Sequence, residues 1–158
     1  MATIVEEGTY EMAEPAELLC VGALIYDRLG RIFIVRRARH VRIFPGAWDI
    51  VGGHLHPGEL VGDALAREVR EETGWALRFI GEQICDWHWT VEGATRHERD
   101  FLVEVEGDLS APCLDSREHD AWMWVTVDTV DVLTERTTGD VRLTEIVARA
   151  LARVKTTP

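Results

Sequence analysis

One segment constrains the fold of this chain more than any other, residues 53–75, which read GHLHPGELVGDALAREVREETGW. Proline and glycine break the chain just before its periodic part, and a glycine follows the last periodic residue. This punctuation predicts a helix over residues 60–73. Three carboxylates, Glu68, Glu71 and Glu72, fall within one and a half turns of that helix, three and four residues apart.

The position of these acids around the helix is unusual. On a wheel of about 100° per residue with Val61 at zero, Leu65 and Val69 fall near 40° and 80°. Glu68 and Glu72 fall near 340° and 20°, so the acids interrupt the apolar stripe where a solvated face would oppose it. Like charges beside a core-facing stripe need a counter-charge, and a divalent metal ion is the most economical one.

The same segment carries a complete signature. Its pattern is glycine, five residues, glutamate, seven residues, and then Arg-Glu-hydrophobic-any-Glu-Glu-any-Gly-hydrophobic. The fixed positions are Gly53, Glu59, Arg67, Glu68, Val69, Glu71, Glu72, Gly74 and Trp75. Every position is filled over twenty-three residues, which is far more specific than a lone glycine motif. In this box the chain resembles the Nudix hydrolases.

Flanking segments extend the resemblance to the MutT-like branch of that family. Residues 32–38 (IFIVRRA) and 44–59 (FPGAWDIVGGHLHPGE) look like the strands that precede the box. One departure is Val51, which stands where the usual Pro-Gly-Gly turn has proline and removes the restraint on φ. Trp48 and Asp49, followed by Gly-Gly-His, are also similar to isopentenyl diphosphate isomerases.

Hydrophobic patterning predicts an α/β (α+β) fold in which a mixed sheet is sandwiched between helices, as the Nudix resemblance also implies. An apolar run, a turn signal and an alternating run predict an N-terminal hairpin of residues 18–26 and 31–35. Further strands are expected at 46–52, 76–89, 97–105 and 121–127, a loop at 107–117 and a second helix at 141–154.

Length and composition favour a single domain and a cytoplasmic location. At 158 residues the chain fits an acidic N-terminal segment, 1–17, and a single Nudix domain, 18–158. The formal charge of −11 disfavours a nucleic-acid or anionic-membrane partner. Three unpaired-looking cysteines and the lack of a signal or membrane-spanning run favour a soluble, cytoplasmic protein. Many relatives dimerise, so a homodimer is a further expectation from the resemblance.

The resemblance implies a metal-dependent reaction at the box. Glu68, Glu71 and Glu72, with the backbone carbonyl of Gly53, are expected to bind Mg²⁺ or Mn²⁺, and one glutamate can instead serve as general base. Arg67 is expected to orient the loop through an ion pair with Glu59; an exposed pair with Glu71 is the alternative.

Outside the box, Glu118 occupies the place where relatives recruit another acid, against the alternative of a surface acid beside Arg117. Glu98 is a weaker candidate for that role. Arg37 ends a strand where relatives contact phosphate, and Trp48 is a candidate to stack on a base, although large aromatics are more often core residues. Five of the six histidines are candidates for a zinc site, but their spacing matches no zinc motif; they are His54, His56, His88, His97 and His119.

These features predict a Mg²⁺-dependent hydrolase that cleaves a nucleoside diphosphate linked to another group, such as a nucleoside triphosphate, by attack of water on phosphorus. An isopentenyl diphosphate isomerase is one alternative, although no cysteine has the Asn-x-x-Cys-His context of those enzymes. A non-catalytic nucleotide sensor is the other, although sensors tend to lose box glutamates. The box predicts the chemistry by which a phosphoanhydride bond is cleaved, but it does not identify the substrate.

Overall fold

The computed structural model of the chain describes residues 18–133 and 143–154. The strands are β1 (Leu18–Ile25), β2 (Ile32–Arg37), β3 (Trp48–Asp49), β4 (Val51–His54), β5 (Ala76–Val91), β6 (Ala94–Glu106) and β7 (His119–Val125). The helices are α1 (Val61–Thr73), a short 3₁₀ turn η1 (Val130–Val132) and α2 (Leu143–Arg153). The predicted acidic segment 1–17, and the first two residues of the helix expected at 141–154, lie outside the described residues.

The strands form two sheets. One has the order β4-β1-β6-β5 and the other the order β3-β2-β7. β1 pairs in parallel with β6, and the remaining ladders are antiparallel, so the first sheet is mixed. β1 is therefore a central strand, hydrogen-bonded on both edges, and β4, which leads into α1, lies directly beside it.

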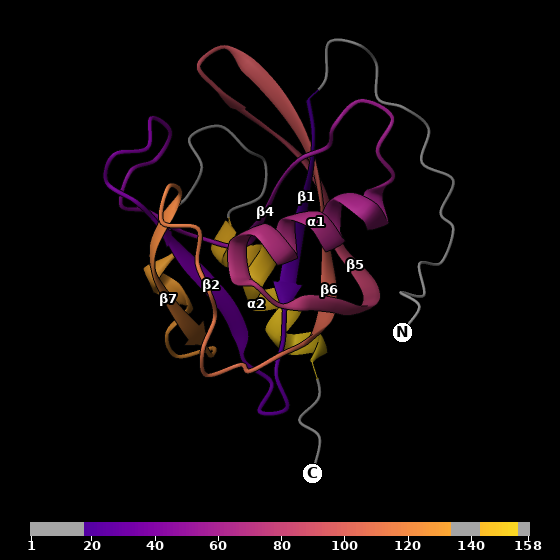
Figure 1. Cartoon of the computed structure of the whole chain (residues 1–158), viewed down its shortest axis with the longest axis vertical. Coiled ribbons are helices and arrows are strands. Elements are labelled where there is room, and N and C mark those ends of the chain that lie inside the picture. The colour runs from indigo at the N-terminus through magenta and orange to yellow at the C-terminus, as the bar shows by residue number, and fades with distance from the viewer. Residues whose placement is uncertain (1–17, 134–142, 155–158) are drawn as a thin grey trace.

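Helices cover both faces of this assembly, α1 in front and α2 behind in the view of Figure 1. The core correspondingly divides into two clusters of buried side chains. One packs under α1 around Val21, Phe33, Leu65 and Val69, and the other packs under α2 around Ile146. The predicted α/β sandwich is confirmed. The central strands β1 and β2 are apolar at successive positions, and because successive side chains point to opposite faces, each strand supplies both clusters.

The predicted N-terminal hairpin is wrong in its pairing. The two strands and the turn between them are present, but only one bridge, Tyr26 to Ile32, joins them before they enter different sheets. Both edges of β1 are already occupied, which leaves no edge for β2. The strand predicted at 46–52 is likewise divided, because β3 joins one sheet and β4 the other.

The remaining elements agree closely with the pattern. β5 and β6 form a long hairpin whose far end extends beyond the sheet in Figure 1. Its turn holds Glu92 and Gly93, both with positive φ, 50° and 75°. Three of the six tryptophans are buried, Trp75, Trp87 and Trp89. Neither helix of the described part of the chain combines the length and apolar character needed to cross a membrane.

Candidate metal and substrate site

The box helix α1 turns two of its three glutamates inward. Glu68 is 8% exposed and Glu72 3%, whereas the Glu71 side chain is 54% exposed. α1 ends at Gly74, whose φ of 76° is the left-handed conformation that favours glycine at a helix C-terminus. The acids that interrupt the apolar stripe on the wheel are thus held at the boundary between the core and a cleft.

Arg67 organises the entrance to the helix. Its guanidinium donates to both oxygens of Glu59 at 2.8 Å and to the backbone carbonyl of His54 at 2.9 Å. The same side chain donates to Glu68 Oε1 at 2.8 Å and to Glu71 Oε2 at 3.3 Å. The expected pair with Glu59 and the alternative pair with Glu71 are both present, and Arg67 is the centre of a network that ties the loop before α1 to the first glutamate of the helix.

The ionisation of this network follows from its geometry. Hydrogen bonds from Arg67 lower the pKa of Glu59 to about 2, and the same bonds raise the pKa of Arg67. Glu59 Oε1 also accepts the backbone N–H of His56 at 3.0 Å. The network is therefore charged at neutral pH, with the positive charge supplied by the chain itself.

Gly53 and Glu68 approach each other closely at the start of the site. A Cβ atom on Gly53 would lie 2.4 Å from Glu68 Oε1, closer than real Cβ contacts occur. Glycine at this box position is thus required for the Glu68 carboxylate to reach the backbone of β4. The contact brings together two of the predicted metal-binding positions.

Glu72 lies one turn further along, beside Gly52, whose N–H donates to its Oε2 at 3.4 Å. Burial raises the pKa of Glu72 well above its ordinary value, and the nearby Glu68 and Glu118 carboxylates raise it further. Burial also raises the pKa of Glu68, against the lowering effect of Arg67. Two buried acids that repel each other are costly unless a cation or a proton joins them.

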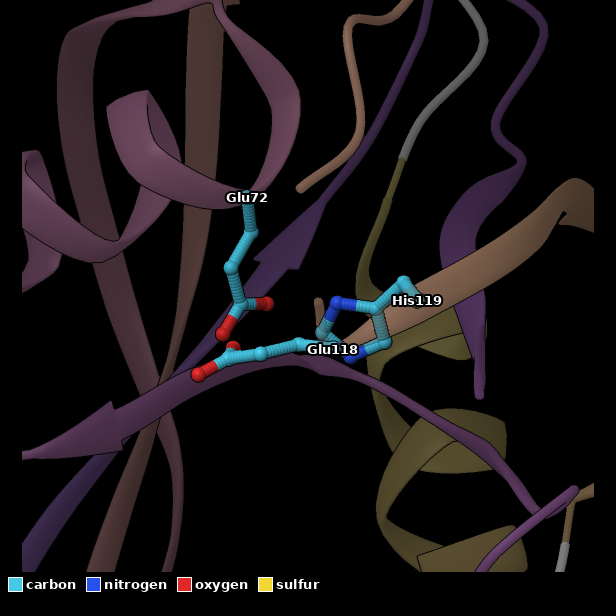
Figure 2. Close-up of side chains that lie close together, drawn as sticks. All are labelled: Glu72, Glu118 and His119. Atoms are coloured by element: carbon cyan, nitrogen blue, oxygen red, sulfur yellow. The ribbon is translucent and has the colours of Figure 1, made fainter. Parts of the chain in front are cut away.

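The loop before β7 brings Glu118 to this point from a distant part of the sequence. The backbone N–H groups of Glu118 and His119 both donate to the carbonyl of Asp115, at 3.0 and 2.9 Å. The carbonyl of Glu118 accepts the N–H of Ala38 at 2.8 Å, which ties the loop to the end of β2. The carboxylate of Glu118 is thereby directed toward Glu72, as Figure 2 shows.

His119 joins the two acids. One ligand atom from each of Glu72, Glu118 and His119 lies within 4.8 Å of the others, as their arrangement in Figure 2 illustrates. The ring of His119 is 4% exposed, and its Nδ1 has no hydrogen-bond partner among the described residues. Burial lowers the pKa of His119 to about 4, so the imidazole is neutral at physiological pH.

These residues fit a divalent cation. The cluster combines two carboxylates with a neutral imidazole, Glu68 lies against the backbone of Gly53, and one buried ring nitrogen lacks a partner. Carboxylate and carbonyl oxygens suit Mg²⁺ and Mn²⁺. A cation here would remove the repulsion that raises the pKa of Glu72.

The cluster opens into a cleft of about 910 Å³ that is lined by the box glutamates, β1, β4 and the loop of residues 38–47. Arg37 lines this cleft, and its Nε donates to the carbonyl of Ile43 at 2.6 Å, which fixes the side chain. Glu98 also lines the cleft, but it is 3% exposed and accepts a hydrogen bond from Trp87 Nε1 at 3.2 Å. The structure thus brings Arg37 to the same cleft as the acids.

Trp48 lies elsewhere. Its indole sits under the guanidinium of Arg36, 5.7 Å from the ring centroid, and packs against the core cluster under α2. These contacts do not test the prediction that Trp48 stacks on a base. A tryptophan in strand context signals core packing as readily as stacking, which explains why the sequence did not separate the two.

His119 is the member of the cluster that sequence reasoning missed. Histidine spacing does not single it out, because that spacing matches no zinc motif. Its adjacency to Glu118 was the available signal, but neighbouring strand residues ordinarily point to opposite faces. The turn at Asp115, which receives both N–H groups, places both residues at the site.

The sequence of this chain is similar to that of several known proteins. A family model described as the NUDIX domain matches residues 17–148. An isopentenyl-diphosphate Δ-isomerase from Mycolicibacterium vanbaalenii is 46% identical over 89 residues, which cover 56% of this chain and 46% of the relative. A nucleoside triphosphatase NudI from Escherichia fergusonii is 41% identical over 58 residues, which cover 37% of this chain and 40% of the relative. The chain spans less than half the length of these curated relatives.

Solved structures extend the likeness over almost the whole fold. The crystal structure of a MutT protein from Methanosarcina mazei superposes with a TM-score of 0.70 at 26% identity. That match covers 88% of this chain and 96% of the other. The arrangement of sheets and helices, and not the box alone, is therefore shared with a MutT protein.

Proposed function

Because the chain belongs to the Nudix family, we propose that it is a divalent-cation-dependent pyrophosphohydrolase that cleaves a nucleoside diphosphate linked to another group. The observation that carries the proposal is the burial of Glu68 and Glu72 beside Glu118 without a basic partner for Glu72 or Glu118 in the described part of the chain. An arrangement that costs stability in the metal-free protein is expected where a bound cation and an anionic substrate are to meet.

In this proposal Glu68, Glu72 and Glu118, with the carbonyl of Gly53, hold Mg²⁺ or Mn²⁺. The cation supplies charge neutralisation for the phosphate oxygens and activation of water. Arg67 keeps Glu68 in place through its bond to Oε1, and Glu59 in turn fixes Arg67. Arg67 is thus a positioning residue, which acts through the glutamates.

Glu71 has a separate role in the proposal. Its side chain is the exposed member of the three, and Arg67 holds one of its oxygens at 3.3 Å. A general base must pass the proton it accepts on to solvent, and an exposed carboxylate does so readily. We therefore assign proton acceptance from the attacking water to Glu71.

The substrate is expected to enter the cleft with its phosphates between the acids and Arg37. A guanidinium whose Nε is already fixed by the carbonyl of Ile43 presents its remaining N–H groups in a defined orientation. The relative NudI is a nucleoside triphosphatase, which supports nucleotides as the substrate class.

A substrate panel tests the proposal. The full chain is incubated with deoxynucleoside triphosphates, oxidised dGTP, ADP-ribose, dinucleoside polyphosphates and nucleotide sugars, each with Mg²⁺ or Mn²⁺, and the products are separated by chromatography. Cleavage of a phosphoanhydride bond that stops when the cation is chelated is expected. No cleavage across the panel with either cation contradicts the proposal.

A second candidate function is isomerisation of isopentenyl diphosphate, which the relative from Mycolicibacterium vanbaalenii favours. Its test is an added arm of the same panel, with isopentenyl diphosphate as substrate and the allylic isomer as product. The intact box, and the lack of any cysteine in an Asn-x-x-Cys-His context, favour hydrolysis. Formation of the isomer without hydrolysis of any nucleotide would reverse that preference.

A further inference from the structure

His119 differs from the other residues of the cleft because its ring is buried among charges and one nitrogen is unsatisfied. It is the first residue of β7 and is 4% exposed. Nδ1 is inaccessible and makes no hydrogen bond with the described residues. Buried polar atoms in folded proteins are nearly always satisfied, so an unsatisfied one calls for a ligand or a specific reason.

The surroundings of the ring identify the kind of ligand. One ring nitrogen lies within 4.8 Å of a carboxylate oxygen of Glu72 and of another from Glu118, and the three side chains converge in Figure 2. Glu72 comes from α1, Glu118 from the turn before β7 and His119 from the first position of β7, and the bonds to Asp115 and Ala38 hold this turn in place. A single ion placed among three such atoms would contact all of them after small side-chain rotations.

Glu72 and Glu118 offer oxygen, whereas His119 offers nitrogen, and this difference affects which ion the site prefers. Mg²⁺ takes oxygen ligands almost exclusively and keeps much of its own hydration. Imidazole nitrogen favours the first-row transition ions, while carboxylates also accept Mn²⁺. A mixed set of two carboxylates and one imidazole therefore suits a transition ion better than it suits Mg²⁺.

We propose that His119 is a nitrogen ligand of the cation that Glu72 and Glu118 hold, and that this ligand gives the site a preference for a divalent transition ion such as Mn²⁺ over Mg²⁺. The proposal rests on the proposed function only in requiring a cation at Glu72 and Glu118. It adds a third protein ligand outside the box and a criterion by which the site selects its metal.

The proposal is tested by pulsed electron paramagnetic resonance of the metal-free full chain after addition of less than one equivalent of Mn²⁺, without substrate. A directly bound imidazole gives a ¹⁴N modulation, and labelling the protein with ¹⁵N-histidine changes that signal. His119→Gln is the test variant, and His88→Gln, at an exposed position on β5, is the matched control. Isothermal titration with Mn²⁺ and with Mg²⁺ accompanies each spectrum.

We expect the ¹⁴N modulation in the wild-type chain and in His88→Gln, and its loss in His119→Gln. The dissociation constant for Mn²⁺ should rise at least about tenfold in His119→Gln, while that for Mg²⁺ changes by less than about threefold. Bound Mn²⁺ without ¹⁴N modulation in the wild-type chain overturns the proposal. Equal losses of affinity for both ions in His119→Gln overturn it as well.

The controls separate this proposal from the broader one. The wild-type spectrum is decisive whether or not His119→Gln folds, and circular dichroism reports the folding of each variant. Glu72→Gln should weaken both ions. If the wild-type chain binds neither ion, or if Glu72→Gln binds both as tightly as the wild type, the cation site of the proposed function itself fails.

Discussion

The two ends of the acidic side of α1 solve the same electrostatic problem differently. Glu59, just before α1, and Glu68, midway along it, share the guanidinium of Arg67, so the chain supplies its own positive charge. One turn later, Glu72 meets Glu118 and the neutral ring of His119, and no ion pair to an arginine or lysine joins this cluster within residues 18–133 and 143–154.

The difference appears in the direction of the pKa shifts. The pKa of Glu59 is lowered to about 2 by Arg67, whereas that of Glu72 is raised by burial and by the neighbouring carboxylates. A network of paired charges stabilises the fold, whereas a cluster of unpaired carboxylates destabilises it until a bound cation compensates their charge. We therefore interpret the Arg67 network as a structural element and the Glu72 cluster as the part of the site that binds the cation.

The largest expected effect is the loss of activity when Glu72 is replaced. Glu72→Gln removes a buried negative charge and a proposed cation ligand, so kcat on the substrate found in the panel should fall at least about 100-fold. The same change should raise the melting temperature of the chelator-treated protein by about 3 °C, because the repulsion with Glu68 and Glu118 is gone. Steady-state kinetics and thermal melts measure the two effects.

Glu71→Gln is the matched control for the stability effect, because it makes the same chemical change at a side chain that is 54% exposed. Its melting temperature without metal should stay within about 1 °C of the wild type. A loss of stability in Glu72→Gln that exceeds the loss in Glu71→Gln would contradict the view that the Glu72 cluster is strained in the absence of a cation.

The next effect concerns the satisfied network. Arg67→Gln leaves Glu59 and Glu68 without their shared partner, and the free energy of unfolding should fall by about 2 kcal/mol, less than for a fully buried pair because Arg67 is 20% exposed. Urea denaturation monitored by tryptophan fluorescence measures the change. Arg153→Gln, which breaks an exposed pair with Glu82, is the control and should cost no more than about 0.5 kcal/mol. Equal costs would contradict a structural role for Arg67.

The smallest effect is the pH dependence that Glu59 contributes. Its pKa lies near 2 in the folded chain and near 4.5 when unfolded, so the unfolded state binds its proton first as the pH falls. The stabilisation by Glu59 is complete above about pH 4.5 and is lost as the pH falls toward 2. The difference in unfolding free energy between the wild type and Glu59→Gln should therefore shrink across this interval, as urea titrations at each pH would show. A difference that stays constant contradicts the ion pair as its source.

The sequence alone predicted the parts of this structure that depend on local pattern. The helix over 60–73, the position of Glu68 and Glu72 beside the core, and the strands β5 and β6 follow from periodicity and from turn residues. The resemblance added the pairing of Arg67 with Glu59, which no helical wheel shows because Glu59 precedes the helix.

What the sequence did not predict depends on contacts between distant segments. The pairing of β1 with β6 competes with the expected hairpin, and local pattern does not reveal which partner an apolar strand will take. His119 lies in the cluster because the turn at Asp115 places two successive residues, Glu118 and His119, at the site. Trp48 packs against the core cluster under α2. Such outcomes depend on packing and hydrogen bonds between segments that are distant in the sequence.

The most direct test of the central claim is hydrolysis of the best panel substrate in ¹⁸O-labelled water, with the wild type and Glu72→Gln compared with and without Mn²⁺ or Mg²⁺. We expect one ¹⁸O atom on a phosphate product for each turnover, only when cation is present, and at least about 100-fold slower incorporation by Glu72→Gln. Incorporation that proceeds at the wild-type rate in Glu72→Gln, or without any divalent cation, would contradict it.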